Sequence, residues 1–247
     1  MNDYLWLFIL LLIALLLKSK YIKGKTGEAI VNFTNKIRLD ETIYKSVNNI
    51  TIKLKDGTTT QIDHVIVSKF GIFVIETKNM KGWIFGSEHQ SKWTQNIFGK
   101  KHQFQNPLHQ NYKHTKSIEE LLGFKKHIFS VIVFVGECEF KTKMPKNVFM
   151  GGGYINYIKS FNKTLFTASE VENIIYTLKN GSLKKGIRTD WEHVNSLKNR
   201  HSNHNKMVCK RCGSNMVERV NKKRNTKFLG CSSYPKCRYT QEMKVMQ

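Results

Sequence analysis

The stretch 61–78, which reads QIDHVIVSKFGIFVIETK, decides the fold. It contains two runs rich in Val, Ile and Phe, a composition typical of strands. The runs are separated by Lys69 and Phe70, directly before a glycine, and so short a connection joins strands that run antiparallel. The stretch therefore predicts two antiparallel strands, 61–68 and 71–78, joined by a tight turn.

The position of the turn determines which side chains face one another. In an antiparallel pair the residue numbers of facing positions have a constant sum, so Val65 lies opposite Val74 and Asp63 opposite Glu76. Lys78 follows Glu76 by two residues and shares its face of the strand. Facing side chains have Cβ atoms about 5 Å apart, so the two carboxylates repel unless a cation lies between them.

A divalent cation such as Mg²⁺ satisfies this requirement. It prefers carboxylate oxygens, and it keeps bound water that can attack a phosphodiester. Lys78 can then orient or deprotonate that water, or neutralise the charge that develops on phosphorus. Asp63, Glu76 and Lys78 are therefore candidate catalytic residues, with Asp63 and Glu76 as candidate Mg²⁺ ligands.

A simpler interpretation is a solvated, salt-bridged patch, because a Glu-x-Lys pattern on its own is common. The neighbours favour a site: Ile72 and Val74 precede Glu76 on its face, and Val65 and Val67 follow Asp63. The charges thus lie at the end of a buried face, which costs stability and is typical of functional positions.

Around the hairpin, the periodicity predicts covering helices and another strand. An amphipathic helix over 26–37 has Glu28 in its first turn and apolar residues at Ala29, Ile30, Phe33 and Ile37. A helix begins at Pro107 and runs through Leu122, a buried strand covers 128–135, and a last helix covers 167–179. Strands mixed with helices predict an α/β domain with a mixed central sheet flanked by helices.

Charge and composition point to a polyanionic partner. Among 247 residues, 41 are Lys or Arg and 18 are Asp or Glu, which gives a formal net charge of +23. Hydrophobic residues make up 40% and aromatic residues 11%, which excludes a wholly disordered chain. Such an excess of positive charge is usually retained because nucleic acid or an anionic membrane neutralises it.

The motifs of this region resemble a known family. They are Thr26-Gly27-Glu28, Gln61 to Val65, Gly71 to Asn79 followed by Gly82, and Asn106-Pro107-Leu108 with Gln110. In this order they resemble the NERD (nuclease-related) domain of the PD-(D/E)XK superfamily. The resemblance implies a restriction-endonuclease-like fold over residues 24–180. It also implies metal ligands at Asp63 and Glu76, a catalytic lysine at Lys78, an accessory acid at Glu28, and phosphate or water contacts at Gln61 and Gln110.

Four of the five cysteines lie near the C-terminus, at Cys209, Cys212, Cys231 and Cys237. The two-residue gap of the first pair lets both thiolates reach one ion, and four thiolates form a closed structural Zn²⁺ site. In so short a segment the ion supplies most of the folding free energy. Free thiols or disulfides are the alternative, but a local cluster in a chain with an odd cysteine count favours metal in a reducing compartment. Cys138 is interpreted as a packing residue.

Basic and aromatic residues surround the cysteines. Cations follow phosphates and exposed rings stack on unpaired bases, so this combination suits single-stranded nucleic acid. The segment 207–240 is similar to the C-terminal four-cysteine zinc finger of bacterial type IA topoisomerases, which implies a small zinc ribbon that binds DNA. The candidate nucleic-acid contacts are Lys222, Lys223, Arg224, Lys227, Phe228, Tyr234, Lys236 and Arg238.

The N-terminal residues 4–17 are uncharged and almost purely apolar. Asp3 precedes this run, lysines follow it, and a small-residue cleavage site is lacking, so the pattern differs from a secretory signal. The flanking lysines favour an uncleaved transmembrane helix whose downstream side is cytoplasmic. A helix buried in a soluble core is the alternative, although the run has no polar face.

The sequence predicts four parts: a membrane anchor (1–20), a nuclease-like domain (24–180), a polar linker (181–206) and a zinc finger (207–247). Together they predict a single-pass protein of a bacterial inner membrane, with its soluble domains in the cytoplasm. The expected activity is Mg²⁺-dependent hydrolysis of DNA. The alternative is a non-catalytic protein that tethers nucleic acid at the membrane.

Overall fold

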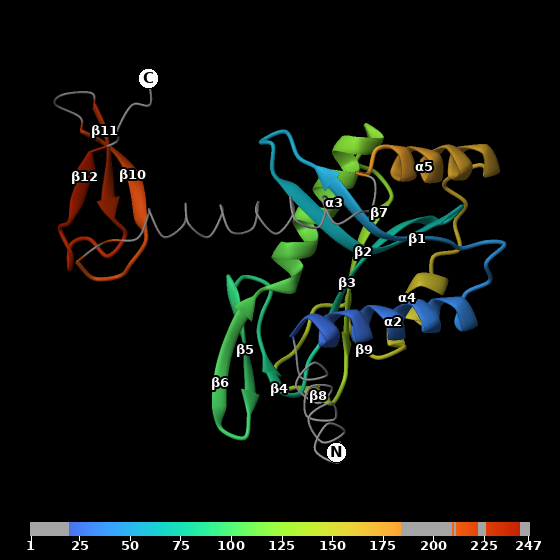
Figure 1. The fold of residues 1–247 in the computed structure, drawn as a ribbon, viewed down its shortest axis with the longest axis horizontal. Coiled ribbons are helices and arrows are strands. Elements are labelled where there is room, and N and C mark those ends of the chain that lie inside the picture. Colours follow the sequence, from blue (N-terminus) through green and yellow to red (C-terminus); the bar gives the residue numbers. More distant parts are fainter. Residues whose placement is uncertain (1–19, 184–208, 210, 222–225, 243–247) are drawn as a thin grey trace, which may run out of the picture. The chain divides into compact units, whose positions relative to one another are not determined.

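The structure is a computed structural model that describes residues 20–183, 209, 211–221 and 226–242. The chain divides into two compact units, Met1–Thr189 and Asp190–Gln247. Figure 1 shows the elements of both units.

The first unit is built on a five-stranded sheet with the order β1-β2-β3-β7-β9. Strands β1, β2 and β3 are antiparallel, whereas β3, β7 and β9 are parallel. The sheet is therefore mixed, as the sequence predicts. The strands are β1 (Lys45–Lys53), β2 (Thr59–Ser68), β3 (Gly71–Asn79), β7 (Ile128–Val135) and β9 (Val148–Met150).

The register of the β2–β3 hairpin is confirmed. Val65 pairs with Val74, and Val67 pairs with Ile72. All four side chains are fully buried, because this face of the sheet is covered by helices.

The strand ladder does not extend to Asp63 and Glu76, which the sequence predicts to face one another. The ladder ends one pair earlier, at His64 opposite Ile75. Beyond it, the Asp63 carboxylate takes over the role of a backbone acceptor: its Oδ2 accepts a hydrogen bond from the Thr77 N–H at 2.9 Å. The strands thus diverge where the candidate site begins, and Asp63 bridges the gap.

Two pairs of helices cover the two faces of the sheet (Figure 1). The helices α2 (Lys20–Arg38) and α4 (Gly153–Lys159) lie on one face. The helices α3 (Pro107–Leu122) and α5 (Ala168–Asn180) lie on the other. The sequence placed α3 and β7 at their observed bounds, and α5 begins after its N-cap residue Thr167.

Helix α2 differs from its prediction in two ways. It begins by Lys20, so Glu28 lies well inside the helix and has no first-turn interaction with the dipole. Its apolar residues Ile30, Phe33 and Ile37 are exposed, at 45%, 67% and 65%. The helix buries Val31 instead, because Gly27, four residues earlier on the same face, makes the close contact with the sheet.

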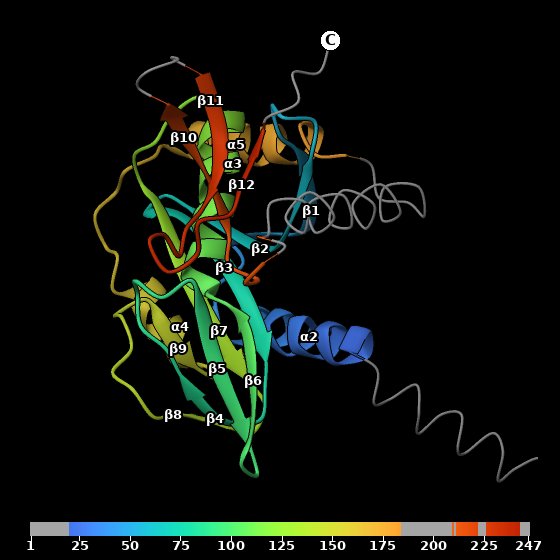
Figure 2. The same cartoon turned by 90° about the vertical axis from the view of Figure 1, so that its left-hand side faces the viewer.

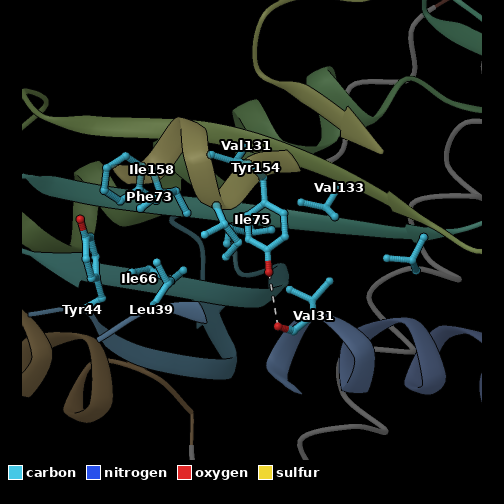
Figure 3. Close-up of a cluster of buried hydrophobic side chains, with 12 residues drawn as sticks. Val31, Leu39, Tyr44, Ile66, Phe73, Ile75, Val131, Val133, Tyr154 and Ile158 are labelled. Atoms are coloured by element: carbon cyan, nitrogen blue, oxygen red, sulfur yellow. Dashed lines mark hydrogen bonds between the residues drawn. The ribbon is translucent and has the colours of Figure 1, made fainter. Parts of the chain in front are cut away.

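Figure 3 shows the core between α2, α4 and the sheet. Phe73, Ile75 and Val131 from the strands pack there against Tyr154 of α4. The buried Tyr154 hydroxyl donates to the Val31 carbonyl oxygen at 3.4 Å and to Asn35 Oδ1 at 2.6 Å. This core fixes the strands that carry the candidate site at their ends.

A second sheet, which the sequence did not predict, has the order β6-β5-β4-β8. Its strand β4 follows β3 directly along the chain, and its strand β6 leads directly into α3. The sheet therefore lies where β3 ends and α3 begins (Figures 1 and 2). The strands are β4 (Gly82–Phe85), β5 (Lys92–Ile97), β6 (Lys100–Gln105) and β8 (Cys138–Phe140).

The second unit contains a three-stranded antiparallel sheet of β10 (Met216–Asn221), β11 (Thr226–Cys231) and β12 (Thr240–Glu242). Its buried core consists of Met216 and three of the clustered cysteines. A small cysteine-rich sheet is thus present where the sequence predicts a zinc ribbon.

Within the described residues, no helix is long and apolar enough to cross a membrane. The expected anchor, 1–20, lies outside the described residues except for its last position. Most of the predicted linker, 181–206, also lies outside them.

Candidate active site and metal centre

Helix α3 is fixed to the sheets by two buried asparagines. Asn106 caps the helix: its Oδ1 accepts from the Leu108 N–H at 2.9 Å, and its Nδ2 donates to the Gln90 carbonyl oxygen at 2.6 Å. Asn111 Nδ2 donates to the Val74 carbonyl oxygen of β3 at 2.8 Å. The first two turns of α3 are therefore held in place against the end of β3.

Glu76 is the buried centre of the site. Its side chain is 3% exposed, and both of its oxygens are engaged. Oε1 accepts from Lys78 Nζ at 2.5 Å, and Oε2 accepts from His114 Nε2 at 3.0 Å. Burial favours the neutral acid, but the Lys78 ammonium and the His114 hydrogen bond outweigh it, and the pKa of Glu76 is below its usual value.

Lys78 connects the strand to α3. Its Nζ donates to Gln110 Oε1 at 2.9 Å in addition to its ion pair with Glu76, and its side chain is 22% exposed. The ammonium is thus held between two side chains at the edge of the site. Sequence analysis expected Lys78 beside Glu76, and the structure brings Gln110 to the same point.

His114 is a site residue that the sequence analysis missed. It is buried, and its Nδ1 lies 2.9 Å from Thr60 Oγ1 of β2. An ionised Glu76 can only accept, so His114 Nε2 donates to it, and the Thr60 hydroxyl is the hydrogen-bond partner of Nδ1. The available signal was its spacing: His114 follows Gln110 by four residues, which places both on one face of the predicted helix.

Asp63 lies in a different electrostatic environment from Glu76. Burial, together with repulsion from Glu76, raises the pKa of Asp63 to about 8, although the hydrogen bond from the Thr77 N–H acts in the opposite direction. Glu28 of α2 also raises this pKa, so three acidic groups act on one another here. A bound cation would relieve this repulsion.

The two accessory glutamines have different positions. Gln110 belongs to the Lys78 network, whereas Gln61 pairs with Thr51 of β1. Glu28 is mostly buried, and its Oε2 lies 3.5 Å from Lys25 Nζ.

The donor set at Asp63 and Glu76 consists of carboxylate oxygens, which suits Mg²⁺. The Glu76 oxygens are already engaged by Lys78 and His114, so an ion would share or replace the Lys78 contact. In the described part of the chain, the four cysteines alone bring three or more ligand atoms close enough to hold one ion. The chemistry therefore fits a divalent cation, but the acidic groups are not yet gathered around one point.

The four cysteine sulfurs, in contrast to the acidic groups, do lie around one point. The Sγ atoms of Cys209, Cys212, Cys231 and Cys237 all lie within 4.8 Å of one another. Cys209 and Cys237 are 3.7 Å apart, and Cys212 and Cys231 are 3.3 Å apart. A tetrahedron with Zn–S bonds of about 2.3 Å has sulfurs about 3.8 Å apart, so the arrangement fits structural Zn²⁺.

Hydrogen bonds within the cluster favour the thiolate form of one ligand. The Ser214 hydroxyl and backbone N–H lower the pKa of Cys212 to about 6. The outlier Cys138, in contrast, packs partly buried beside Met150 and has its pKa raised to about 11 by burial. It therefore behaves as the predicted packing residue.

The residues predicted to contact nucleic acid are partly exposed around the cysteines. Tyr234 is 58% exposed, with the Arg219 guanidinium 5.3 Å from its ring centre. Lys236 and Arg238 are exposed, whereas Lys227 forms an ion pair with Glu218 at 2.7 Å. Phe228 is half-buried. Lys222, Lys223 and Arg224 lie outside the described residues.

Comparisons with known proteins agree with both parts. A family model described as "Nuclease-related domain" matches residues 23–135, and one described as "Topoisomerase DNA binding C4 zinc finger" matches residues 206–245. An uncharacterized protein of Bacillus anthracis is 38% identical over 207 residues, which cover 78% of this chain and 96% of that protein. No solved structure matches the chain.

Proposed function

The chain belongs to the family of nuclease-related (NERD) domain proteins with a C-terminal topoisomerase-type zinc finger, and on this premise we propose that it is a metal-dependent nuclease of DNA. The finger binds single-stranded DNA, and the first unit hydrolyses phosphodiester bonds with a restriction-endonuclease-like arrangement of sheet and helices. One observation carries the proposal: Lys78 is paired with Glu76 at the end of β3, and Asp63 is held by the Thr77 N–H of that strand, near enough for Glu76 to raise the Asp63 pKa.

In this proposal Asp63 and Glu76 hold Mg²⁺, with Glu28 as an accessory acid. The ion, when bound, lowers the pKa of a water molecule and neutralises phosphate charge. Lys78 lies at the edge of the site, held by Gln110, where its ammonium can contact a phosphate oxygen. Hydrolysis forms a bond from the water oxygen to phosphorus, breaks the ester bond to the leaving oxygen, and transfers a proton to that oxygen.

The test is cleavage of DNA and of RNA by the full chain with Mg²⁺. Lys78→Ala and Asp63→Asn are expected to slow cleavage about 100-fold or more, because each removes a group that acts on the transition state. Lys55→Ala is the matched control, since Lys55 is an exposed lysine in the turn between β1 and β2. Activity that survives both site substitutions would reject the assignment.

A second candidate function is non-catalytic binding of nucleic acid. It is favoured by the engagement of both Glu76 oxygens by protein groups. It predicts salt-sensitive binding that is unchanged by chelation of Mg²⁺, with no cleavage product.

For residues 1–20, we propose a single membrane anchor that keeps the remaining chain on the cytoplasmic side of a bacterial inner membrane. The apolar run at 4–17 and the lysines that follow support it. Fractionation tests this: the full chain is expected in membranes after a carbonate wash, and a chain lacking 1–20 is expected in the supernatant.

A further inference from the structure

Phe98 occupies an unusual position at the tip of the β5–β6 hairpin. Ile97 pairs with Lys100, so Phe98 and Gly99 form a two-residue turn. Phe98 has a φ of 48°, and its side chain is fully exposed. Turns of this kind usually carry Asn, Asp or Gly, because a bulky residue with positive φ is strained. A strained and fully exposed aromatic ring points to a role outside the fold.

The hairpin residue Phe98 lines a hollow together with Trp83. Trp83 of β4 is 49% exposed, and the hollow has a volume of about 450 Å³. Ile97 also lines it, and Lys81 and Glu137 lie at its rim. Two exposed rings with a small apolar floor fit the flat faces of nucleobases better than they fit a long apolar segment.

Charged side chains surround the hollow. The Lys141 ammonium lies over the Trp83 ring, 4.8 Å from its centre, and pairs with Glu139 at 2.7 Å, while Lys81 pairs with Glu137 at 3.0 Å. Lys100 and Lys101 follow the hairpin tip and are exposed. Lysines beside exposed rings provide both contacts that a single strand needs, namely charge for phosphates and faces for stacking.

The hollow is connected to the candidate active site through the backbone. Lys78 is followed closely by Lys81, at the rim, and then by Trp83. Gln95 Nε2 of β5 donates to the Lys81 carbonyl oxygen at 2.8 Å, which fixes the hairpin to the segment that leaves the site. The hollow is thus built on the segment that follows β3, five residues or fewer along the chain from Lys78 at Lys81 and Trp83.

We propose that Trp83 and Phe98 form a base-stacking platform for single-stranded nucleic acid, separate from the zinc finger. The proposal rests on the proposed function for its substrate class and adds a second binding site in the first unit. The exposed lysines near the hairpin contact the sugar-phosphate chain while one or two bases stack on the rings.

Cross-linking tests the location of the strand. The full chain, without added Mg²⁺ to prevent cleavage, is irradiated with an oligothymidine that carries 5-iododeoxyuridine, and the adducts are mapped by mass spectrometry. Adducts on peptides that contain Trp83 or Phe98 are expected. Adducts confined to the finger, 207–247, would overturn the proposal.

Affinity measurements test the rings themselves. Phe98→Gly and Trp83→Ala are made in the full chain with Cys231→Ser and Cys237→Ser, which removes two zinc ligands of the finger from every variant alike. Each is expected to weaken oligothymidine binding about tenfold, the size of one stacking contact. Phe98→Gly is expected to keep or raise the melting temperature, because glycine relieves the strained turn. Tyr176→Ala, at an exposed ring on α5, is the matched control and should change neither quantity.

The outcomes separate this proposal from the nuclease assignment. Weaker binding in the platform variants without cleavage by any variant would support the platform and reject the nuclease. Unchanged oligothymidine binding in these variants would reject the platform, whether or not Lys78→Ala stops cleavage. Loss of binding to vesicles of anionic lipid, with unchanged oligothymidine binding, would identify a membrane contact and also reject it.

Discussion

Asp63 and Glu76 carry the same functional group but have opposite pKa shifts. Glu76 has a cation and a hydrogen-bond donor within 3.0 Å, so it is stable as an anion inside the protein. Asp63 has one backbone donor and acidic neighbours, so its proton is retained to about pH 8. Two carboxyl groups with separated pKa values are typical of acid–base and metal sites.

The raised pKa of Asp63 predicts a pH-dependent stability. Its usual value is 3.8, so between pH 4 and 8 the native state holds a proton that the unfolded chain has released. This stabilisation is complete below about pH 4. It falls by at most about 1.4 kcal/mol per pH unit as the pH rises, and it is lost once the pH has risen through 8. Asp63→Asn removes it, so without added Mg²⁺ the variant should gain stability relative to the native chain from pH 5 to pH 8, as measured by denaturant unfolding.

Asp40 provides the control for that measurement. Hydrogen bonds from Thr42 lower the pKa of Asp40, so it is ionised in both states above pH 5. Asp40→Asn should therefore shift stability by the same amount at pH 5 and pH 8. If Asp63→Asn also shifts the free energy of unfolding by the same amount at pH 5 and pH 8, the electrostatic description of the site is contradicted.

His114 is predicted to stabilise the site by pairing a buried anion. His114→Ala leaves Glu76 Oε2 without this donor, and an unsatisfied buried polar group costs about 1–3 kcal/mol. His114→Gln offers an amide donor and should recover part of the loss. The free energy of unfolding of the two variants checks this, and an alanine variant as stable as the native chain would contradict it.

At the scale of elements, the contact between α2 and β3 depends on one glycine. A Cβ atom on Gly27 would lie 2.9 Å from Asn79 Cβ and 3.3 Å from Val135 Cγ2. A Cβ atom on Gly24, in the same helix, would meet nothing within 4 Å. The Thr-Gly-Glu motif thus provides a close helix–strand contact that brings Glu28 near Asp63.

These two glycines should respond to alanine in opposite directions. Gly24→Ala is expected to stabilise by about 0.5–1 kcal/mol, because alanine loses less backbone entropy in a helix. Gly27→Ala is expected to destabilise by about 1 kcal/mol or more, because overpacking exceeds that gain. Thermal or denaturant unfolding of both variants checks this, and shifts of the same sign would show that Gly27 is not a packing position.

The elements that the sequence predicted best are those with local signals. Pro107 marks the start of α3, and the run 128–135 is apolar throughout. The second sheet was missed because Lys100 to Gln105 is mostly polar and exposed, so no apolar alternation marks it. The face of α2 was assigned wrongly because a glycine contact outweighed the larger residues Phe33 and Ile37.

The same reasoning explains how much of the site the sequence predicted. The positions of Asp63, Glu76 and Lys78 at one end of two neighbouring strands follow from the hairpin register, which depends on residues close together along the chain. The His114 and Thr60 contacts depend on how α3 crosses β2 and β3, and no local pattern encodes that crossing.

At the scale of the whole molecule, the two units have separate hydrophobic cores. If Zn²⁺ holds the second unit together, removal of the ion should unfold that unit alone. Hydrogen exchange should then show loss of protection over 209–242 and unchanged protection in β2, β3 and β7. Cys138→Ser is the control, because Cys138 lies outside the cluster. Loss of protection in both units would contradict this independence.

The topology of the large sheet also has a consequence for synthesis on the ribosome. Strands β1 to β3 form a meander with short connections, so they can pair soon after residue 79 emerges. Their parallel neighbour β7 and the helix α3 are translated later. In that interval Glu76 is still open to water, and the nascent chain acquires its buried anion only when the later segments close over it.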